Sequence, residues 1–133
     1  NESLFLSLQN SQKMLVQEFQ KNILSIGEVS MVVIGGRVTH SVLKKVKDGD
    51  YRVQDDYGGT VKLYKPSVDE IRFGELVVSM CKPAPIYARV DIIKNNENKI
   101  ALSELELIEP ELWFRFNPDS ANLLATRIVQ KYC

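Results

Sequence analysis

The first strong pattern in the sequence is an alternation of apolar and polar residues over residues 27–46, with the period of two that is typical of β-strands. The β-branched run 29–34 is followed by the pair Gly35-Gly36 and then by a second alternating run over residues 37–43. Glycines supply the positive φ angles that a tight turn requires. The pattern therefore predicts a β-hairpin.

The register of this hairpin decides which side chains share a face. Pairing of Ile34 with Arg37 is the register that a two-residue turn favours. It places these residues together on one face: Glu28, Ser30, Val32, Thr39, Ser41 and Leu43. It places His40 and Lys44 on the other face.

A second alternation, over residues 86–109, contains the residues with the most chemistry. A run over 86–94 reaches an Asn-rich turn at 95–98 and returns over 99–109, which predicts a second hairpin. The polar positions of its two strands include Arg89, Asp91, Glu104 and Glu106. A four-residue turn sets Arg89 across from Glu104. We therefore expect three carboxylates and one guanidinium on one polar face.

Two further stretches have the helical period. Ser67 and Glu70 have the spacing of a capping box and open a predicted helix near residues 67–81. Its apolar stripe is Phe73, Leu76, Val77 and Met80. Asn117 is predicted to cap a terminal helix that has Pro118 at its first position. The apolar stripe of that helix is Leu124, Ala125, Ile128, Val129 and Tyr132.

The remaining segments complete the predicted fold. Residues 1–8 favour a short helix, residues 14–16 a buried strand that runs out into the polar residues 17–20, and residues 47–66 an extended loop. No repeat or linker divides the 133 residues, so we predict one domain. Its fold class is α+β, an antiparallel sheet made largely of two hairpins that packs against helices near 67–81 and 118–132.

Composition and charge exclude several classes of function. Seventeen basic residues balance seventeen acidic ones, so the chain lacks the positive excess that nucleic-acid binding uses. The longest unbroken apolar run, residues 31–34, is far too short to span a membrane. Two isolated cysteines, Cys81 and Cys133, fit a reducing compartment, so we expect a cytoplasmic protein. The absence of an initiator Met suggests part of a longer protein.

The acidic face of the second hairpin is the strongest candidate for chemistry. Carboxylates that converge from neighbouring strands are hard oxygen ligands, which suit Mg²⁺ or Mn²⁺ better than zinc. An arginine beside them could stabilise the charge on a transferring phosphoryl group. The pattern by itself favours a plainer interpretation, a solvated face with Arg89 and Glu104 as a cross-strand ion pair. His40 has no nucleophile or acid placed beside it by spacing, which favours a partly buried structural imidazole.

Several motifs in chain order give the sequence a family resemblance. They are Val-Gln-Glu-Phe at 16–19, Gly-Glu-Val-Ser at 27–30, Ile-Gly-Gly at 34–36, residues 40–44, Gly-Asp-Tyr-Arg at 49–52, Tyr-Gly-Gly at 57–59, Arg-Val-Asp at 89–91 and residues 104–110. Over about residues 14–132 the chain resembles the C-terminal part of ATP-grasp carboxylate-amine ligases. The resemblance is to the branch near prokaryotic glutathione synthetase and the ligases that add glutamate to a ribosomal protein. It reverses the plainer interpretation of the acidic face.

The resemblance implies a role for each matching residue. Gln17, Glu18 and Phe19 would form the hinge that faces the adenine, with Glu18 near the exocyclic amine, and Glu28 would hold the ribose hydroxyls. The implied magnesium ligands are Asp91, Glu104 and Glu106, the last standing where many relatives carry Asn. Arg89 would lie beside the transferred phosphoryl and acyl-phosphate oxygens. Lys44 and Arg52 match cationic positions near phosphate or substrate.

The resemblance also implies what such an enzyme needs beyond this sequence. The family closes two lobes on ATP, and the first lobe supplies a lysine and a glycine-rich loop that are absent before Val16. We therefore expect the C-terminal lobe of an ATP- and Mg²⁺-dependent ligase, with a carboxylate and an amine as substrates. Alone it should be catalytically silent and bind Mg·ATP weakly or not at all. Exposed apolar surface could drive self-association. The alternative is a non-catalytic binding or structural module that retains the fold.

Overall fold

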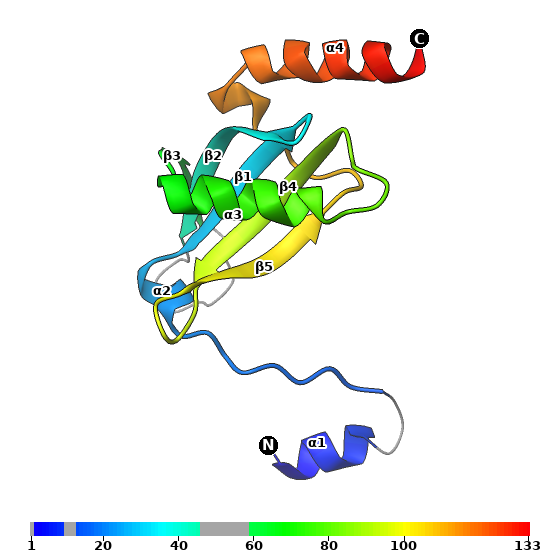
Figure 1. Ribbon diagram of the computed structural model, residues 1–133. Helices are drawn as coiled ribbons and strands as arrows, with labels where there is room; N and C mark the ends of the chain where they lie inside the picture. Colours follow the sequence, from blue (N-terminus) through cyan, green and yellow to red (C-terminus); the bar gives the residue numbers. More distant parts are fainter. Residues whose placement is uncertain (1, 10–12, 46–58) are drawn as a thin grey trace.

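The computed structural model describes residues 2–9, 13–45 and 59–133, and it has an α+β fold (Figure 1). Within these described ranges, five strands form one antiparallel sheet in the order β3-β2-β1-β4-β5. The strands are β1 (Glu28–Ile34), β2 (Arg37–Lys45), β3 (Thr60–Tyr64), β4 (Tyr87–Lys94) and β5 (Ile100–Glu106). The helices are α1 (Glu2–Gln9), α2 (Asn22–Ser25), α3 (Val68–Ser79) and α4 (Asp119–Tyr132), with a 3₁₀ turn at Phe114–Phe116. The predicted fold class is confirmed.

The first hairpin has the predicted turn but a shifted register. Ile34 pairs with Arg37 as expected, and a β-bulge then places Val32 opposite His40. The extra residue is Thr39, whose hydroxyl donates to the backbone oxygen of Val32 at 3.1 Å. Because a bulge reverses the alternation beyond it, Lys44 lies opposite Glu28. The predicted separation of Lys44 from Glu28 on opposite faces was therefore wrong.

The second hairpin is also confirmed with a corrected register. Its turn is closed by Asn95, whose Oδ1 accepts from the backbone amides of Glu97 and Lys99 at 3.0 and 2.9 Å. Next to the turn, Lys94 pairs with Ile100, and a bulge between Asp91 and Ile92 then shifts the pairing by one more residue. Arg89 consequently lies opposite Glu106, and Asp91 lies opposite Glu104. The predicted gathering of these groups on one face holds, although the partner of Arg89 differs.

Helix α3 covers one face of the sheet and closes the larger core (Figure 1). Its capping box is present: the Ser67 hydroxyl accepts from the Glu70 amide, and the Glu70 carboxylate accepts from the Ser67 amide at 2.7 Å. The buried apolar residues of this core are Val29, Met31, Val33, Val78, Ala88, Val90 and Ile92. Gly74 allows close approach to the sheet, since a Cβ there would lie 2.7 Å from Met31 Cε.

Parts of the predicted apolar stripes face away from the sheet. In α3, Leu76 and Met80 are exposed, and Gly74 and Val78 take the inward positions instead. In α4, Ile128 and Val129 are exposed, whereas Leu124 packs on a second apolar cluster, which lies on the other face of the sheet and consists of Val32, Ile34, Val42 and Trp113. Asn117 does not cap α4 with its side chain, because its Nδ2 donates to the backbone oxygen of Thr39 at 3.3 Å.

Two predicted segments were wrong. Residues 14–16 form no strand and are exposed, with Leu15 94% exposed, because no neighbouring strand pairs with this segment in the part of the chain that the structure describes. The predicted loop over 47–66 includes a strand, β3, whose alternation is short and stands beside turn-forming residues. Among the described residues, no helix is long and apolar enough to cross a membrane.

Candidate metal and nucleotide site

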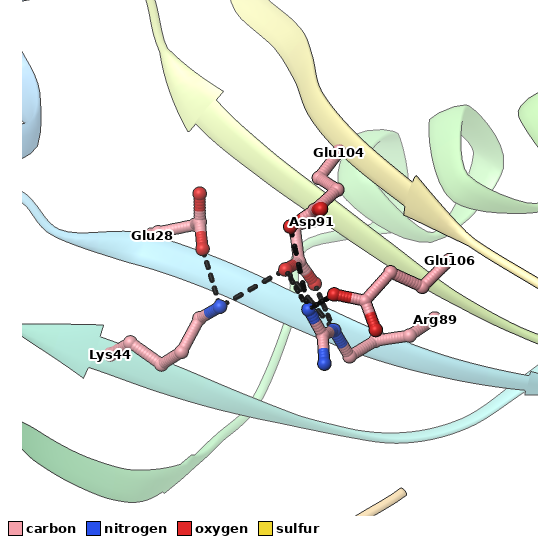
Figure 2. Close-up of polar contacts among 6 residues, drawn as sticks. All are labelled: Glu28, Lys44, Arg89, Asp91, Glu104 and Glu106. Atoms are coloured by element: carbon pink, nitrogen blue, oxygen red, sulfur yellow. Dashed lines mark hydrogen bonds and ion pairs between the residues drawn. The ribbon is translucent and has the colours of Figure 1, made fainter. Parts of the chain in front are cut away.

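The face of the sheet opposite α3 contains a buried cluster of charged side chains (Figure 2). Glu28 comes from β1, Lys44 from β2, and Arg89 and Asp91 from β4. All four residues are less than a tenth exposed, and Asp91 is fully buried. Charged groups are seldom buried this deeply unless they are paired. This burial argues against the solvated polar face that the pattern alone favoured.

Lys44 joins two carboxylates from neighbouring strands. Its Nζ lies 2.5 Å from Glu28 Oε1 and 3.0 Å from Asp91 Oδ2. The β1–β2 bulge makes this possible, because it brings Lys44 to the face that Glu28 occupies. Glu28 and Lys44, which were assigned to separate faces from the sequence, therefore form one ion pair inside the cluster.

Arg89 links the buried carboxylate to the two carboxylates of β5. Its Nε lies 3.0 and 3.1 Å from the two Asp91 oxygens, and its Nη2 lies 3.0 Å from Asp91 Oδ2. Nη2 also contacts Glu106 and lies 3.5 Å from Glu104 Oε2. Burial would lower the pKa of Arg89, but the three carboxylates outweigh burial and raise it, so the guanidinium stays charged.

The carboxylates of Asp91, Glu104 and Glu106 form a group that could hold a metal ion. One oxygen from each lies within 4.8 Å of the others. Exposure rises across the group, from buried Asp91 through Glu106 to Glu104, whose side chain is 57% exposed. The group is therefore open at the Glu104 side. Hard oxygen donors in this arrangement suit Mg²⁺ or Mn²⁺.

The charge balance of the cluster also fits a divalent cation. Among the described residues, four carboxylates, those of Glu28, Asp91, Glu104 and Glu106, face two cations, Lys44 and Arg89, which leaves a formal charge of minus two. Burial and the charges of Glu106 and Asp91 raise the pKa of Glu104, although Arg89 opposes them. Burial is the larger cause of this raised pKa, and the two neighbouring carboxylates add to it. A divalent cation would relieve the repulsion among the three carboxylates.

Trp113 covers the cationic part of the cluster, and sequence reasoning missed it. The centroid of its ring lies 5.8 Å from Lys44 Nζ and 5.4 Å from Arg89 Cζ, within the range of cation–π attraction. Trp113 is buried and has a left-handed backbone with φ 44°. A bulky residue adopts that conformation only where the surrounding packing demands it. No local sequence signal identifies such a contact.

His40 supports the segment that carries Trp113. Its Nε2 lies 2.9 Å from the backbone oxygen of Leu112, so Nε2 carries the hydrogen, because a carbonyl can only accept. Its Nδ1 lies 3.0 Å from the Thr39 hydroxyl. Burial lowers the pKa of His40 despite the backbone hydrogen bonds that oppose it. The predicted structural role of this imidazole is confirmed.

Ser30 is a second residue of this face that sequence reasoning did not single out. It lies opposite Asp91 in the β1–β4 pairing and is fully buried. Among the side chains that the structure describes, its hydroxyl is the buried polar group without a hydrogen-bond partner. A buried polar group without a partner lowers the free energy of unfolding by about 1–3 kcal/mol. An unsatisfied donor beside Asp91 is consistent with a site arranged for something other than stability.

The residues predicted to bind the nucleotide lie in different parts of the structure. It brings Glu28 and Lys44 into the cluster, whereas residues 17–19 lie on an exposed segment before α2. That segment contacts the β4–β5 turn, where the side-chain Nδ2 of Asn96 donates to Glu18 Oε1 at 3.1 Å. Arg52, the rest of the motif at 49–52, and the first two residues of the Tyr-Gly-Gly motif at 57–59 lie outside the described residues.

Comparisons with known proteins place this cluster in a family context. Residues 2–107 match the family model of the RimK-like ATP-grasp domain. A structure of D-cycloserine synthetase DcsG is similar at a TM-score of 0.70 and 21% identity, over 86% of this chain and 41% of that one. A D-alanine–D-alanine ligase from Bacillus anthracis, complexed with ATP, is similar at 0.54 and 12%, over 97% and 45%.

At these identities, the two structures show a shared fold. This chain spans less than half the length of either similar protein. Among curated proteins, no sequence matches this chain.

Proposed function

The chain belongs to the RimK-like ATP-grasp domain family, and from this premise we propose that it forms the metal and nucleotide wall of an ATP-dependent carboxylate-amine ligase. The observation that carries the proposal is the convergence of Asp91, Glu104 and Glu106 around Arg89, in a cluster with an excess of two negative charges. A purely structural ion-pair network has no need of that excess.

The reaction that we propose has two steps. An oxygen of the substrate carboxylate attacks the γ-phosphorus of ATP, and the bond from that phosphorus to the ADP oxygen breaks, which leaves an acyl phosphate. The nitrogen of the amine then attacks the acyl carbon, inorganic phosphate leaves with the carbon–oxygen bonding electrons, and the nitrogen loses a proton. Both steps depend on positioning and on the stabilisation of negative oxygens.

Each residue of the cluster has a part in this proposal. Asp91, Glu104 and Glu106 would hold Mg²⁺ or Mn²⁺, which when bound neutralises phosphate oxygens. Arg89 would stabilise the charge on the transferred phosphoryl group and the acyl phosphate. Its raised pKa keeps it cationic throughout. Lys44 would face phosphate or substrate oxygens.

The remaining contacts would hold the nucleoside. Residues 17–19 would face the adenine, and Glu28 would accept from the ribose hydroxyls. The ion pair with Lys44 uses Glu28 Oε1, which leaves Oε2 for such a hydroxyl. This division of one carboxylate between a cation and a sugar is compatible with the burial of Glu28.

A trapping experiment tests the proposed chemistry. The product of the complete reading frame that contains this chain is incubated with ATP, Mg²⁺, a panel of amino-acid carboxylates and hydroxylamine. We expect a hydroxamate to form together with ADP, because hydroxylamine intercepts an acyl phosphate. Arg89→Met should lower both products in parallel. ADP without hydroxamate for any carboxylate would contradict an acyl-phosphate ligase and favour a module that only retains the fold.

The 133-residue chain alone should not turn over ATP. Only one wall of the proposed cleft is available in it, and phosphoryl transfer needs preorganised charge on both sides of the nucleotide. We expect weak, millimolar binding of Mg·ATP, measured by calorimetry or by NMR titration. Tight binding or measurable ADP release by the chain would refute this part of the proposal.

A further inference from the structure

Asn96, in the β4–β5 turn, makes hydrogen bonds to four consecutive residues of the segment before α2. Its side-chain Nδ2 donates to Glu18 Oε1 at 3.1 Å and to the Phe19 backbone oxygen at 3.0 Å. Its Oδ1 accepts from the Lys21 amide at 2.9 Å, and its own amide donates to Gln20 Oε1 at 3.0 Å. One residue therefore holds residues 18–21 against the turn.

The held segment has little structure of its own. Residues 13–20 contain no helix or strand, and Leu15 and Phe19 are exposed. Figure 1 shows the trace leaving the sheet near α2 and the β4–β5 turn and running out toward α1. A second anchor follows directly, since Asn22 Nδ2 donates to the Asn95 backbone oxygen at 2.6 Å and to Asn98 Oδ1 at 3.1 Å.

The turn that holds this segment belongs to the hairpin that carries the acidic group. Asp91 lies on β4, and Glu104 and Glu106 lie on β5. The hairpin therefore connects residues 18–21 at its turn to the three carboxylates along its strands. An asparagine suits the turn position because its amide offers two donors and an acceptor in one rigid plane.

We propose that Asn96 is a positioning residue that fixes the adenine-facing segment relative to the metal-binding carboxylates. The inference rests on the proposed function for the role of residues 17–19. The hydrogen bonds themselves do not depend on it. Asn96 sets the distance between the two halves of a bound nucleotide, the base at the turn and the phosphates at the carboxylates.

Hydrogen exchange on the 133-residue chain tests the anchor without any ligand. Asn96→Ala removes the acceptor of the Lys21 amide, so that amide should exchange at least about fivefold faster, the factor that corresponds to one lost hydrogen bond. Glu97→Ala is the matched control in the same turn, because the Glu97 carboxylate pairs with the exposed Lys99. If the Lys21 amide exchanges at the same rate in Asn96→Ala as in the original chain, Asn96 does not anchor this segment.

NMR titration with two probes tests what the anchor is for. The ¹⁵N-labelled chain is titrated with Mg·ATP and with Mg·tripolyphosphate, which lacks the nucleoside. We expect Asn96→Ala to weaken the ATP response about fivefold while the tripolyphosphate response stays at the value of the original chain and of Glu97→Ala. A general loss of structure would weaken both responses.

The outcomes separate this inference from the proposed function. Equal ATP affinity in Asn96→Ala and the original chain would refute the positioning role. An equal loss for both probes would also refute it, in favour of a structural role. If the original chain responds to neither probe at millimolar concentration, the proposed nucleotide site fails in this chain and its positioning residue with it, whatever exchange shows of the anchor.

Discussion

The two faces of the sheet are built from alternate residues of the same strands, yet only one of them buries a cluster of charged side chains among the described residues. The face toward α3 carries Val29, Met31, Val33, Ala88, Val90 and Ile92. The other face is mixed: it carries Glu28, Ser30, Lys44, Arg89 and Asp91 beside a smaller apolar cluster of Val32, Ile34, Val42 and Trp113. Both sets are buried to a similar degree. Burial alone therefore does not explain the polar face.

The energetics of the two faces differ accordingly. Each buried aliphatic side chain of the apolar face contributes about 1.5–3 kcal/mol through the loss of contact with water. Buried ion pairs seldom stabilise a fold, because the desolvation of each charge offsets its attraction to the partner. Perturbed, buried charges in a cluster are instead typical of functional sites. The apolar clusters on both faces stabilise the fold, and the charged cluster carries the proposed activity.

The largest expected effect comes from breaking one buried ion pair. Lys44→Met leaves the Glu28 carboxylate buried without its partner, while Asp91 keeps its pair with Arg89, and we expect the free energy of unfolding to fall by about 3–5 kcal/mol. The double variant Lys44→Met, Glu28→Gln removes both charges and should recover most of that loss. Urea denaturation measures both. A double variant as unstable as the single one would show that the pair stabilises the fold and would remove the contrast between the faces.

A truncation on the apolar face should cost slightly less. Met31 is fully buried between the sheet and α3, next to Gly74. Met31→Ala should lower the free energy of unfolding by about 2–5 kcal/mol without altering the affinity for divalent ions. The exposed Leu76→Ala is the control in the same denaturation series. A change in Mn²⁺ affinity in Met31→Ala would mean that the two faces are coupled.

The dependence of the free energy of unfolding on pH tests the role of His40, which holds the segment that covers the charged cluster. Its lowered pKa in the folded state means that the unfolded chain binds a proton more readily, so stability is present above pH 6.5 and is lost as the pH falls below it. The slope is at most about 1.4 kcal/mol per pH unit. His40→Gln should flatten the curve between pH 7.5 and 5.5. His40 is the single histidine of the sequence, so a variant with the same slope would refute the assignment.

The smallest expected effect concerns Glu104, whose pKa shift makes stability fall as the pH rises, opposite to the effect of His40. The raised pKa of Glu104 means that its contribution to stability is lost as the pH rises through the folded value, so at neutral pH the charged carboxylate opposes folding. Glu104→Gln should leave the free energy of unfolding unchanged or raise it by a few tenths of a kcal/mol, because the side chain is largely exposed. Glu97→Gln is the surface control. A clear loss of stability would make Glu104 a structural residue.

Alternation was sufficient to predict the hairpins and the acidic group. The period of two places Arg89 with Asp91 on β4, and Glu104 with Glu106 on β5. The two pairs share one face because the observed pairing differs from the predicted one by two residues, and a shift of two keeps the same face. The bulges could not be predicted from the sequence, because one extra residue such as Thr39 changes the strand pairing without changing the pattern of apolar and polar residues. That one residue decides whether Lys44 meets Glu28.

Long-range packing explains the remaining differences. Residues 14–16 have the composition of a buried strand, but burial requires a neighbouring strand that the local pattern does not specify. Trp113 reaches the cluster through a left-handed backbone and a hydrogen bond between His40 and Leu112. Neither feature has a local signal. The residues of the acidic group were therefore predictable, whereas the aromatic cover and the Asn96 anchor required the fold.

The most direct test of the central claim is Mn²⁺ binding to the chain and to the double variant Asp91→Asn, Glu104→Gln. If these carboxylates with Glu106 form the metal site, calorimetry or water-proton relaxation should show affinity at least about tenfold weaker in the double variant, since two of three charged ligands are neutralised. Glu97→Gln should bind as the original chain does. Equal Mn²⁺ affinity in the chain and the double variant would contradict the account.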